Sequence, residues 1–218
     1  MIKMSSPYLI EFRFHGYAKR YLKSLIFDVS RKFRVRTVTR KRVVPHVTLF
    51  GPFSTRDENK VLSTIVSVCS NYELVPFKLR GFGNFGNEVI YVDIEPSEQL
   101  KNLRRELTHS LTGLRSFFFM KTVPQTKVFD RDEEFNFHAT VAFKDIGYKF
   151  DRIWNYLKHK RPPDINQYLL RVTLLKKSKI LYEYDLLQKR PLTRTEAKKK
   201  EIFRKTVQIL KSRIYQER

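Results

Sequence analysis

Two pairs of residues, far apart in the chain, combine side chains that can transfer protons with side chains that can hold a phosphate. His46 is followed two positions later by Thr48, and His138 is followed two positions later by Thr140. The neighbouring positions are apolar, and this alternation is typical of a β-strand. Side chains two positions apart on a strand share one face. Each histidine is therefore predicted to point the same way as its threonine.

These four residues suit the cleavage of a phosphodiester. One group must take a proton from the attacking oxygen, and another must give a proton to the leaving oxygen. Two imidazoles can do this near neutral pH, one neutral and one protonated, because histidine titrates at about pH 6.5. Threonine hydroxyls can donate hydrogen bonds to phosphoryl oxygens. We therefore predict that His46 and His138 are catalytic and that Thr48 and Thr140 bind the phosphate.

Other uses of these histidines have weaker support. A zinc site needs three or four ligands, and no third His, Cys or acidic residue accompanies either pair at ligand spacing. A serine or cysteine nucleophile stays open, although the sequence contains no GxSxG string. A purely structural role for both histidines is the remaining alternative. The sequence thus predicts neither a metal nor another cofactor.

The two pairs resemble the H-x-T-hydrophobic motifs that define the two-histidine (2H) phosphoesterase superfamily. The order of elements from about Tyr8 to Leu187 is similar to its LigT-like branch, which includes RNA 2′,3′-cyclic phosphodiesterases and 2′-5′ RNA ligases. The resemblance implies two pseudo-symmetric α+β lobes of mainly antiparallel sheet with flanking helices. Both motif strands would line a central cleft.

The resemblance also implies a reaction, the hydrolysis of terminal 2′,3′-cyclic phosphates of RNA to 2′-phosphates. In this scheme His138 activates water and His46 protonates the leaving 3′ oxygen, although the reverse assignment stays open. Reverse 2′-5′ RNA ligation stays open as a second activity. The alternatives are cleavage of 2′-5′ linked or cyclic oligonucleotides, and an RNA-binding protein of the same fold with little catalysis.

Two residues near the motifs are further candidates for binding the substrate. Many LigT-like enzymes carry an arginine shortly after the second motif, whereas Lys144 stands there in this chain. Lys144 can supply positive charge but lacks the planar fork of a guanidinium group. Phe50, directly after the first motif, could stack on a base, with core packing as an equal alternative.

The chain carries a large excess of positive charge. Lys and Arg total 44 against 22 Asp and Glu, which gives a net charge of +22 at pH 7. Such an excess usually persists because the protein binds a polyanion, so RNA or an oligonucleotide is the predicted partner. A strand in the basic segment 31–42 would place alternate arginines on one face near the first motif. We predict RNA-backbone contacts from Arg34, Arg36, Arg40 and Arg42, with a solvated basic loop as the alternative.

The hydrophobic pattern predicts alternating strands and helices. Strands are predicted at Tyr8–Phe14, Val43–Phe50, Leu74–Gly81, Val89–Ile94, Phe137–Phe143, Tyr168–Leu175 and Ile180–Leu187. Helices are predicted at Ala18–Phe33, Asp57–Ser70, Ser97–Leu111 and Phe150–Lys158, with a loop at Thr112–Glu134. Short turns between successive strands indicate antiparallel pairing and an α+β class. The predicted organisation is a bilobal domain at residues 1–188 and a basic C-terminal helical extension at residues 189–218.

The cysteine count and the lack of long apolar stretches indicate the cellular compartment of the protein. Cys69 is the single cysteine, so an internal disulfide is excluded and a reducing environment is favoured. The sequence shows no signal peptide and no apolar stretch of the roughly 18 residues that a membrane span needs. These features predict a cytoplasmic protein, and they leave its oligomeric state open.

Overall fold

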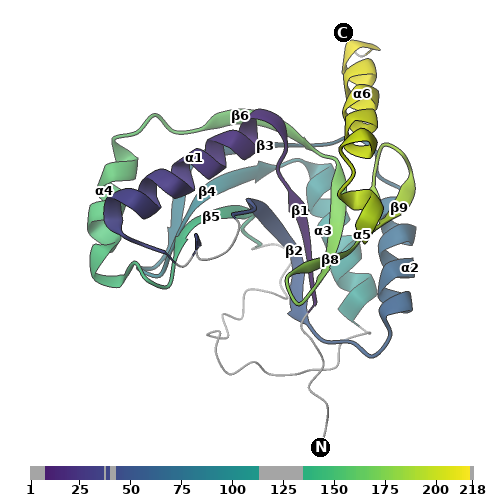
Figure 1. Cartoon of the computed structure of the whole chain (residues 1–218), viewed down its shortest axis with the longest axis horizontal. Helices are drawn as coiled ribbons and strands as arrows, with labels where there is room; N and C mark the ends of the chain where they lie inside the picture. Colours follow the sequence, from purple (N-terminus) through teal and green to yellow (C-terminus); the bar gives the residue numbers. More distant parts are fainter. Residues whose placement is uncertain (1–7, 37, 40–42, 113–134, 217–218) are drawn as a thin grey trace, which may run out of the picture.

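The structure of the chain is a computed structural model that describes residues 8–36, 38–39, 43–112 and 135–216 (Figure 1). It contains two antiparallel sheets with helices packed around them. Within the described residues, no helix is long and apolar enough to cross a membrane. The predicted loop at Thr112–Glu134 falls almost entirely outside this part of the chain.

The two sheets together form the α+β framework expected from the sequence. The five-stranded sheet has the order β2-β1-β7-β8-β9 and contains β1 (Tyr8–Arg13), β2 (His46–Phe53), β7 (Arg171–Lys176), β8 (Lys179–Asp185) and β9 (Arg190–Thr193). The four-stranded sheet has the order β5-β4-β3-β6 and contains β3 (Val75–Phe85), β4 (Val89–Pro96), β5 (His138–Phe143) and β6 (Asp164–Leu169). Both motif strands, β2 and β5, are therefore edge strands.

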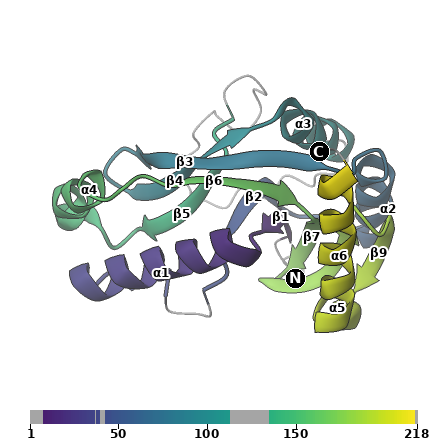
Figure 2. The same ribbon diagram turned by 90° about the horizontal axis from the view of Figure 1, so that it is seen from above.

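The two halves repeat the same unit of strand, helix and strand. In the first, β1 leads through α1 (Gly16–Phe33) to β2, which pairs antiparallel with β1. In the second, β4 leads through α3 (Glu98–Thr112) to β5, which pairs antiparallel with β4. Each helix packs against the motif strand of the other half, since α1 contacts β5 and α3 contacts β2 (Figures 1 and 2). This exchange joins the two halves and brings β2 and β5 into contact.

The helices bury regularly spaced apolar residues in one continuous core. In α1 these are Ala18, Leu22, Leu25, Ile26, Val29 and Phe33, and in α3 they are Leu100, Leu103, Leu107 and Leu111. In each motif strand the residues between the polar positions also belong to this core: Val47, Leu49, Ala139 and Val141. The alternation in the motifs thus fixes which face of each strand is left for chemistry.

Four further helices complete the described chain, together with one short turn of 3₁₀ helix. They are α2 (Glu58–Cys69), η3 (Gly147–Lys149), α4 (Phe150–Lys158) and the pair α5 (Arg194–Ala197) and α6 (Lys200–Gln216). The helix α2 packs against α3, and α6 projects from the side of the five-stranded sheet (Figure 2).

Two predicted strands have different limits in the structure. The first motif strand begins at His46 and continues through Gly51 and Pro52 to Phe53, because two shifts in its register with β1 accommodate two extra residues. The segment predicted as one strand at 168–175 is split between β6 and β7, which belong to different sheets. The apolar residues of this segment are buried in both sheets, so hydrophobicity alone does not show where the chain passes from one sheet to the other.

The segment predicted as a helical extension begins instead with a strand. β9 pairs with β8 and adds the fifth strand to the first sheet, and α5 and α6 follow. A second apolar cluster holds α6 in place, with Leu210 of α6 packed near Leu170 and Leu187. The helix therefore docks on its own fold through an apolar stripe that also includes Phe203, Val207 and Ile214.

Candidate active site

The two motif histidines occupy equivalent positions in their half-domains. His46 lies opposite Arg13 of β1, and His138 lies opposite Asp93 of β4. Because β2 and β5 are the edges at which the two sheets come into contact, the polar faces of both motifs belong to the same region of the molecule. The charge of His46 acts on the pKa of His138, which reflects their proximity.

Both imidazole rings are held by the same hydrogen bond. Nδ1 of His46 lies 2.9 Å from the carbonyl oxygen of Val44, and Nδ1 of His138 lies 2.9 Å from that of Asn136. A carbonyl oxygen only accepts, so each Nδ1 carries the hydrogen. In the neutral ring the lone pair is then on Nε2, and this nitrogen is available to take or give a proton.

His46 lies beside a buried carboxylate. Its Nε2 is 3.7 Å from Oε2 of Glu11, a residue that is only 2% exposed. The other oxygen of Glu11 accepts a hydrogen bond of 2.7 Å from Nε of Arg13. An imidazolium at His46 thus has an ion-pair partner, while Arg13 balances the carboxylate from its other side.

His138 lies in an aromatic environment. The ring of Phe85 is 4.9 Å from its imidazole in an edge-on arrangement, and the ring of Tyr91 is 5.1 Å away. The hydroxyl of Tyr91 accepts a hydrogen bond of 2.9 Å from Asn136, the residue whose carbonyl holds Nδ1 of His138. Burial lowers the pKa of His138, and the charge of His46 acts in the same direction, against the opposing effects of the Asn136 carbonyl and Asp93.

The two motif threonines are half-buried and stand next to the histidines on the same strands. Thr48 lies opposite Glu11, and Thr140 lies opposite Tyr91. Within the described residues neither hydroxyl has a hydrogen-bond partner in the protein. Both hydroxyls are therefore free to donate to oxygens of a bound group.

Comparison with known proteins identifies the family. The family model described as "2'-5' RNA ligase superfamily" matches residues 28–179, which include both motifs. The chain belongs to this superfamily of 2H phosphoesterases.

Individual proteins agree with this membership. A Bacillus pumilus (strain SAFR-032) protein named "Putative phosphoesterase" is 26% identical over 128 residues, which are 56% of this chain and 75% of that protein. A protein of Geobacillus sp. (strain WCH70) with a similar name is 28% identical over 96 residues, or 42% of this chain and 56% of its own. The crystal structure of TT0787 of Thermus thermophilus has a TM-score of 0.54 at 16% identity and covers 83% of this chain and 98% of that one, so it shares the fold.

Two other predicted site residues are less suited to binding a substrate. Phe50 is 5% exposed, and its ring packs against Phe53 with 5.1 Å between centroids, so it belongs to the core and has little surface for a base. Lys144 follows the end of β5 in a left-handed conformation, with Nζ 5.0 Å from the ring of Phe143. Four strand positions, roughly 13 Å, separate its backbone from Thr140.

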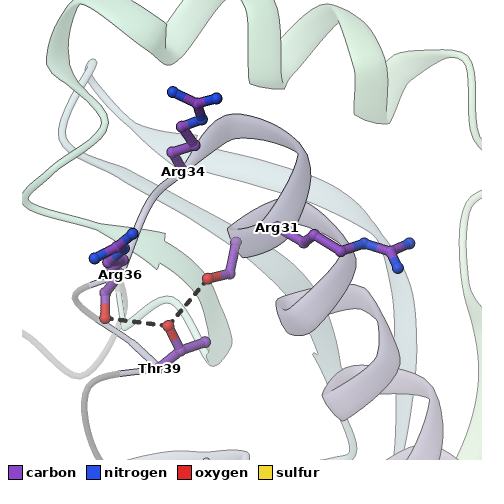
Figure 3. A pocket seen from close by; sticks show the side chains of 5 residues that line it. Arg31, Arg34, Arg36 and Thr39 are labelled. Carbon is purple, nitrogen blue, oxygen red and sulfur yellow. Dashed lines mark hydrogen bonds between the residues drawn. The ribbon is translucent and has the colours of Figure 1, made fainter.

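The basic segment also differs from its prediction. Phe33 ends α1 and Arg34 adopts a left-handed conformation, so these residues do not form the expected strand. Arg34 and Arg36 line a surface pocket at this turn, and none of the four motif residues is among those that line it (Figure 3). Arg40 and Arg42 lie outside the described residues.

The structure adds residues that the motifs alone do not reveal, namely Glu11, Arg13, Phe85 and Tyr91. Glu11 and Arg13 interrupt an otherwise apolar strand, and two charges at that spacing on a buried strand are a signal of function. Phe85 and Tyr91 carry no comparable signal, because their role depends on how β3 and β4 pair. In the described part of the chain, no group of three or more His, Cys, Asp or Glu residues could hold a metal ion.

Proposed function

We propose that this 2H phosphoesterase hydrolyses 2′,3′-cyclic phosphate ends of RNA to 2′-phosphates without a metal ion. The observation that supports this most directly is the matched pair of histidines. Each has Nδ1 bound to a backbone carbonyl and Nε2 available for proton transfer. Hydrolysis of a cyclic phosphate needs one base and one acid at the same phosphorus atom, and the two histidines can fill both roles.

In the proposed reaction His138 is the base and His46 is the acid. Nε2 of His138 takes a proton from water as the water oxygen bonds to phosphorus. The bond from phosphorus to the 3′ oxygen breaks, and the protonated Nε2 of His46 gives its proton to that oxygen. The product carries a 2′-phosphate and a 3′-hydroxyl, and proton exchange with solvent restores the two rings.

The surroundings of the two rings support this assignment. Burial lowers the pKa of His138 and so favours the neutral form that a base requires. Glu11, 3.7 Å from Nε2 of His46, offers an ion-pair partner to the protonated form that an acid requires. Exchanging the two roles would place the base beside a carboxylate and the acid in the more buried environment.

The neighbouring groups suit a nucleotide. The hydroxyls of Thr48 and Thr140 can donate to the two non-bridging phosphoryl oxygens, on which negative charge develops during attack. Phe85 is 39% exposed and lies against His138, so its ring can stack on a base near the reacting phosphate. The net charge of +22 favours association with RNA, and the single buried Cys69 fits our further proposal of a cytoplasmic location.

The test is hydrolysis of a 2′,3′-cyclic mononucleotide by purified protein in excess EDTA. His46→Ala and His138→Ala should each lower turnover by at least about a hundredfold, because each removes one of the two proton transfers. His109→Ala is the matched control, since His109 is exposed on α3 and should leave the rate unchanged. Near-normal rates in either motif variant would contradict the mechanism.

The same assay separates the alternatives. Activity abolished by EDTA and restored by Zn²⁺ or Mn²⁺ would overturn the metal-free proposal. Faster cleavage of a 2′-5′ linked dinucleotide would identify that linkage, and not the cyclic phosphate, as the substrate. The reverse reaction can be followed as 2′-5′ ligation of the products. RNA binding without turnover of any of these substrates would leave an RNA-binding protein of the 2H fold.

A further inference from the structure

A basic cavity lies at the C-terminal end of α1, and none of the four motif residues lines it. It is a cavity of about 400 Å³, which we call the arginine pocket (Figure 3). Its lining residues are Ser30, Arg31, Arg34, Arg36 and Thr39. Three arginines within six sequence positions thus line one small cavity.

Hydrogen bonds within the segment fix the floor of the arginine pocket. The hydroxyl of Ser30 donates to the carbonyl of Val35 at 2.5 Å and lies 3.0 Å from the hydroxyl of Thr39. The hydroxyl of Thr39 in turn donates to the carbonyl of Arg36 at 3.2 Å. Val35 is 5% exposed and anchors the turn in the core. The backbone that carries the arginines is therefore held in place before any ligand binds.

Contacts to the segment after β5 hold the same turn from the other side. The backbone N–H of Arg36 donates to a carboxylate oxygen of Asp145 at 2.6 Å, and Nζ of Lys149 donates to the carbonyl of Arg34 at 3.3 Å. The guanidinium groups are not used in this anchoring. Among the described residues, no carboxylate lies within ion-pair distance of any of the three.

The charges of the pocket favour an anion with several acceptor oxygens. Guanidinium groups bind phosphate through paired hydrogen bonds, and three adjacent cations that form no ion pair with the described residues repel one another. Cations in the last turn of a helix also interact favourably with its dipole. That effect accounts for Arg31 but not for Arg34 and Arg36, which lie beyond the helix end.

The arginine pocket is anchored beyond the end of β5 that is opposite to His138. Asp145, which binds Arg36, follows the C-terminal end of β5, whereas His138 stands at the N-terminal end. Five strand intervals, roughly 17 Å, separate the two ends of β5. A phosphate in the arginine pocket would belong to another part of the same RNA chain.

We propose that the arginine pocket binds a backbone phosphate of the RNA whose cyclic end reacts at His46 and His138. The preferred substrate is then an oligonucleotide rather than a mononucleotide. The preference for an oligonucleotide substrate rests on the proposed function, whereas the binding of RNA does not. Binding of RNA to the pocket can be measured without turnover.

The experiment compares two triple variants that remove the same charge. In the pocket variant Arg31, Arg34 and Arg36 are changed to Gln, and in the control variant Arg20, Arg152 and Arg204 are changed to Gln. The control arginines are exposed, and the described residues offer them no ion-pair partner. Thermal unfolding checks that both variants fold. The readouts are affinity for a fluorescent single-stranded RNA, and kcat and KM for a cyclic-ended oligonucleotide and for a 2′,3′-cyclic mononucleotide.

The pocket variant should bind RNA roughly tenfold or more weakly than the control variant, as expected when a charge-assisted hydrogen bond is removed. Its plot of log affinity against log salt should also flatten by about 0.7 for each phosphate that the variant no longer binds. KM for the oligonucleotide should rise with kcat unchanged, and both constants for the mononucleotide should stay the same. Changing the three arginines to Lys should restore only part of the affinity, because lysine keeps the charge but lacks the fork.

Two results would overturn the inference. Equal losses of affinity in the pocket and control variants would show that only total charge matters, and unchanged binding in the pocket variant would show that the pocket takes no RNA. The proposed function fails separately, if the wild-type protein hydrolyses neither cyclic substrate. A specific loss of RNA affinity in that case would keep the phosphate site and remove only its link to turnover.

Discussion

At the scale of single residues, the two histidines have equivalent backbone positions and different surroundings. His46 has a carboxylate near its Nε2, and its side chain is 41% exposed. His138 is packed by Phe85 and Tyr91, and burial lowers its pKa. The symmetry of the motifs supplies two proton-transfer groups. Their differing neighbours supply the asymmetry that a base and an acid need.

The lowered pKa of His138 predicts where activity begins as pH rises. A base must be neutral, so kcat/KM should rise with pH through the pKa of His138, and this acidic limb should lie below about 6.5. Phe85→Ala should move the limb upward, toward that value, because removing the ring admits water to the imidazole. Tyr148→Ala is the control, since Tyr148 is 90% exposed. An acidic limb that stays in place in the Phe85 variant would show that this ring does not shape the titration.

At the scale of the elements, the pairing of β3 with β4 positions the second motif. Gly83 lies opposite Tyr91, and a Cβ atom at Gly83 would overlap the Tyr91 ring. The absence of a side chain there lets Tyr91 lie over β3. From that position it contacts His138 and accepts the hydrogen bond of Asn136.

Gly83→Ala should therefore reduce catalysis through Tyr91. Displacing the Tyr91 ring disturbs both the packing of His138 and the Asn136 hydrogen bond, so kcat should fall roughly tenfold to a hundredfold, as small misplacements of catalytic groups do. The free energy of unfolding should fall by about 1–3 kcal/mol from overpacking. Gly147→Ala is the matched control, because a Cβ there meets nothing within 4 Å. Wild-type kcat in the Gly83 variant would rule out this role of the strand pair.

The sequence predicts the elements better than it predicts their partners. The His-x-Thr spacing identified both motif strands, and the alternation gave the face that each buries. The division between β6 and β7 was missed, because strands of different sheets can follow one another with a single residue, Leu170, between them. β9 was missed because it is short and contains Pro191, which is tolerated at a sheet edge. The carboxylate near His46 was also missed, since it depends on the register between β1 and β2.

At the scale of the whole molecule, a buried charged cluster joins the first sheet to the C-terminal helix. Arg171 donates to Asp185 at 2.9 Å, to Glu183 at 3.2 Å and to the hydroxyl of Thr206 on α6 at 3.2 Å. The Thr206 hydroxyl donates to Asp185 at 2.5 Å. All four residues are buried. Arg171 is thus the cation in direct contact with both carboxylates, and Arg13 also acts on Glu183 from a greater distance.

Removing this cation should destabilise the fold strongly. Arg171→Met leaves Glu183 and Asp185 buried without the cation that contacts both of them, so the free energy of unfolding in urea should fall by about 3–5 kcal/mol at pH 7. Arg190→Met is the control. It breaks a more exposed pair with Glu196, with side chains 41% and 31% exposed, and should change stability by about 1 kcal/mol or less.

The pH dependence of that loss of stability identifies its cause. Burial raises the pKa of Glu183, and Arg171 opposes this effect, so the pKa should rise further in the Arg171→Met variant. When the pKa of a carboxyl group is higher in the folded state than in the unfolded state, the protein loses stability as pH rises through the ordinary range of glutamate. The destabilisation of the variant should therefore be larger at pH 7 than at pH 5. The ring centroid of Phe203 lies 5.1 Å from the guanidinium of Arg171. An equal destabilisation at both pH values would mean that this packing, and not the charge of Arg171, holds α6 in place.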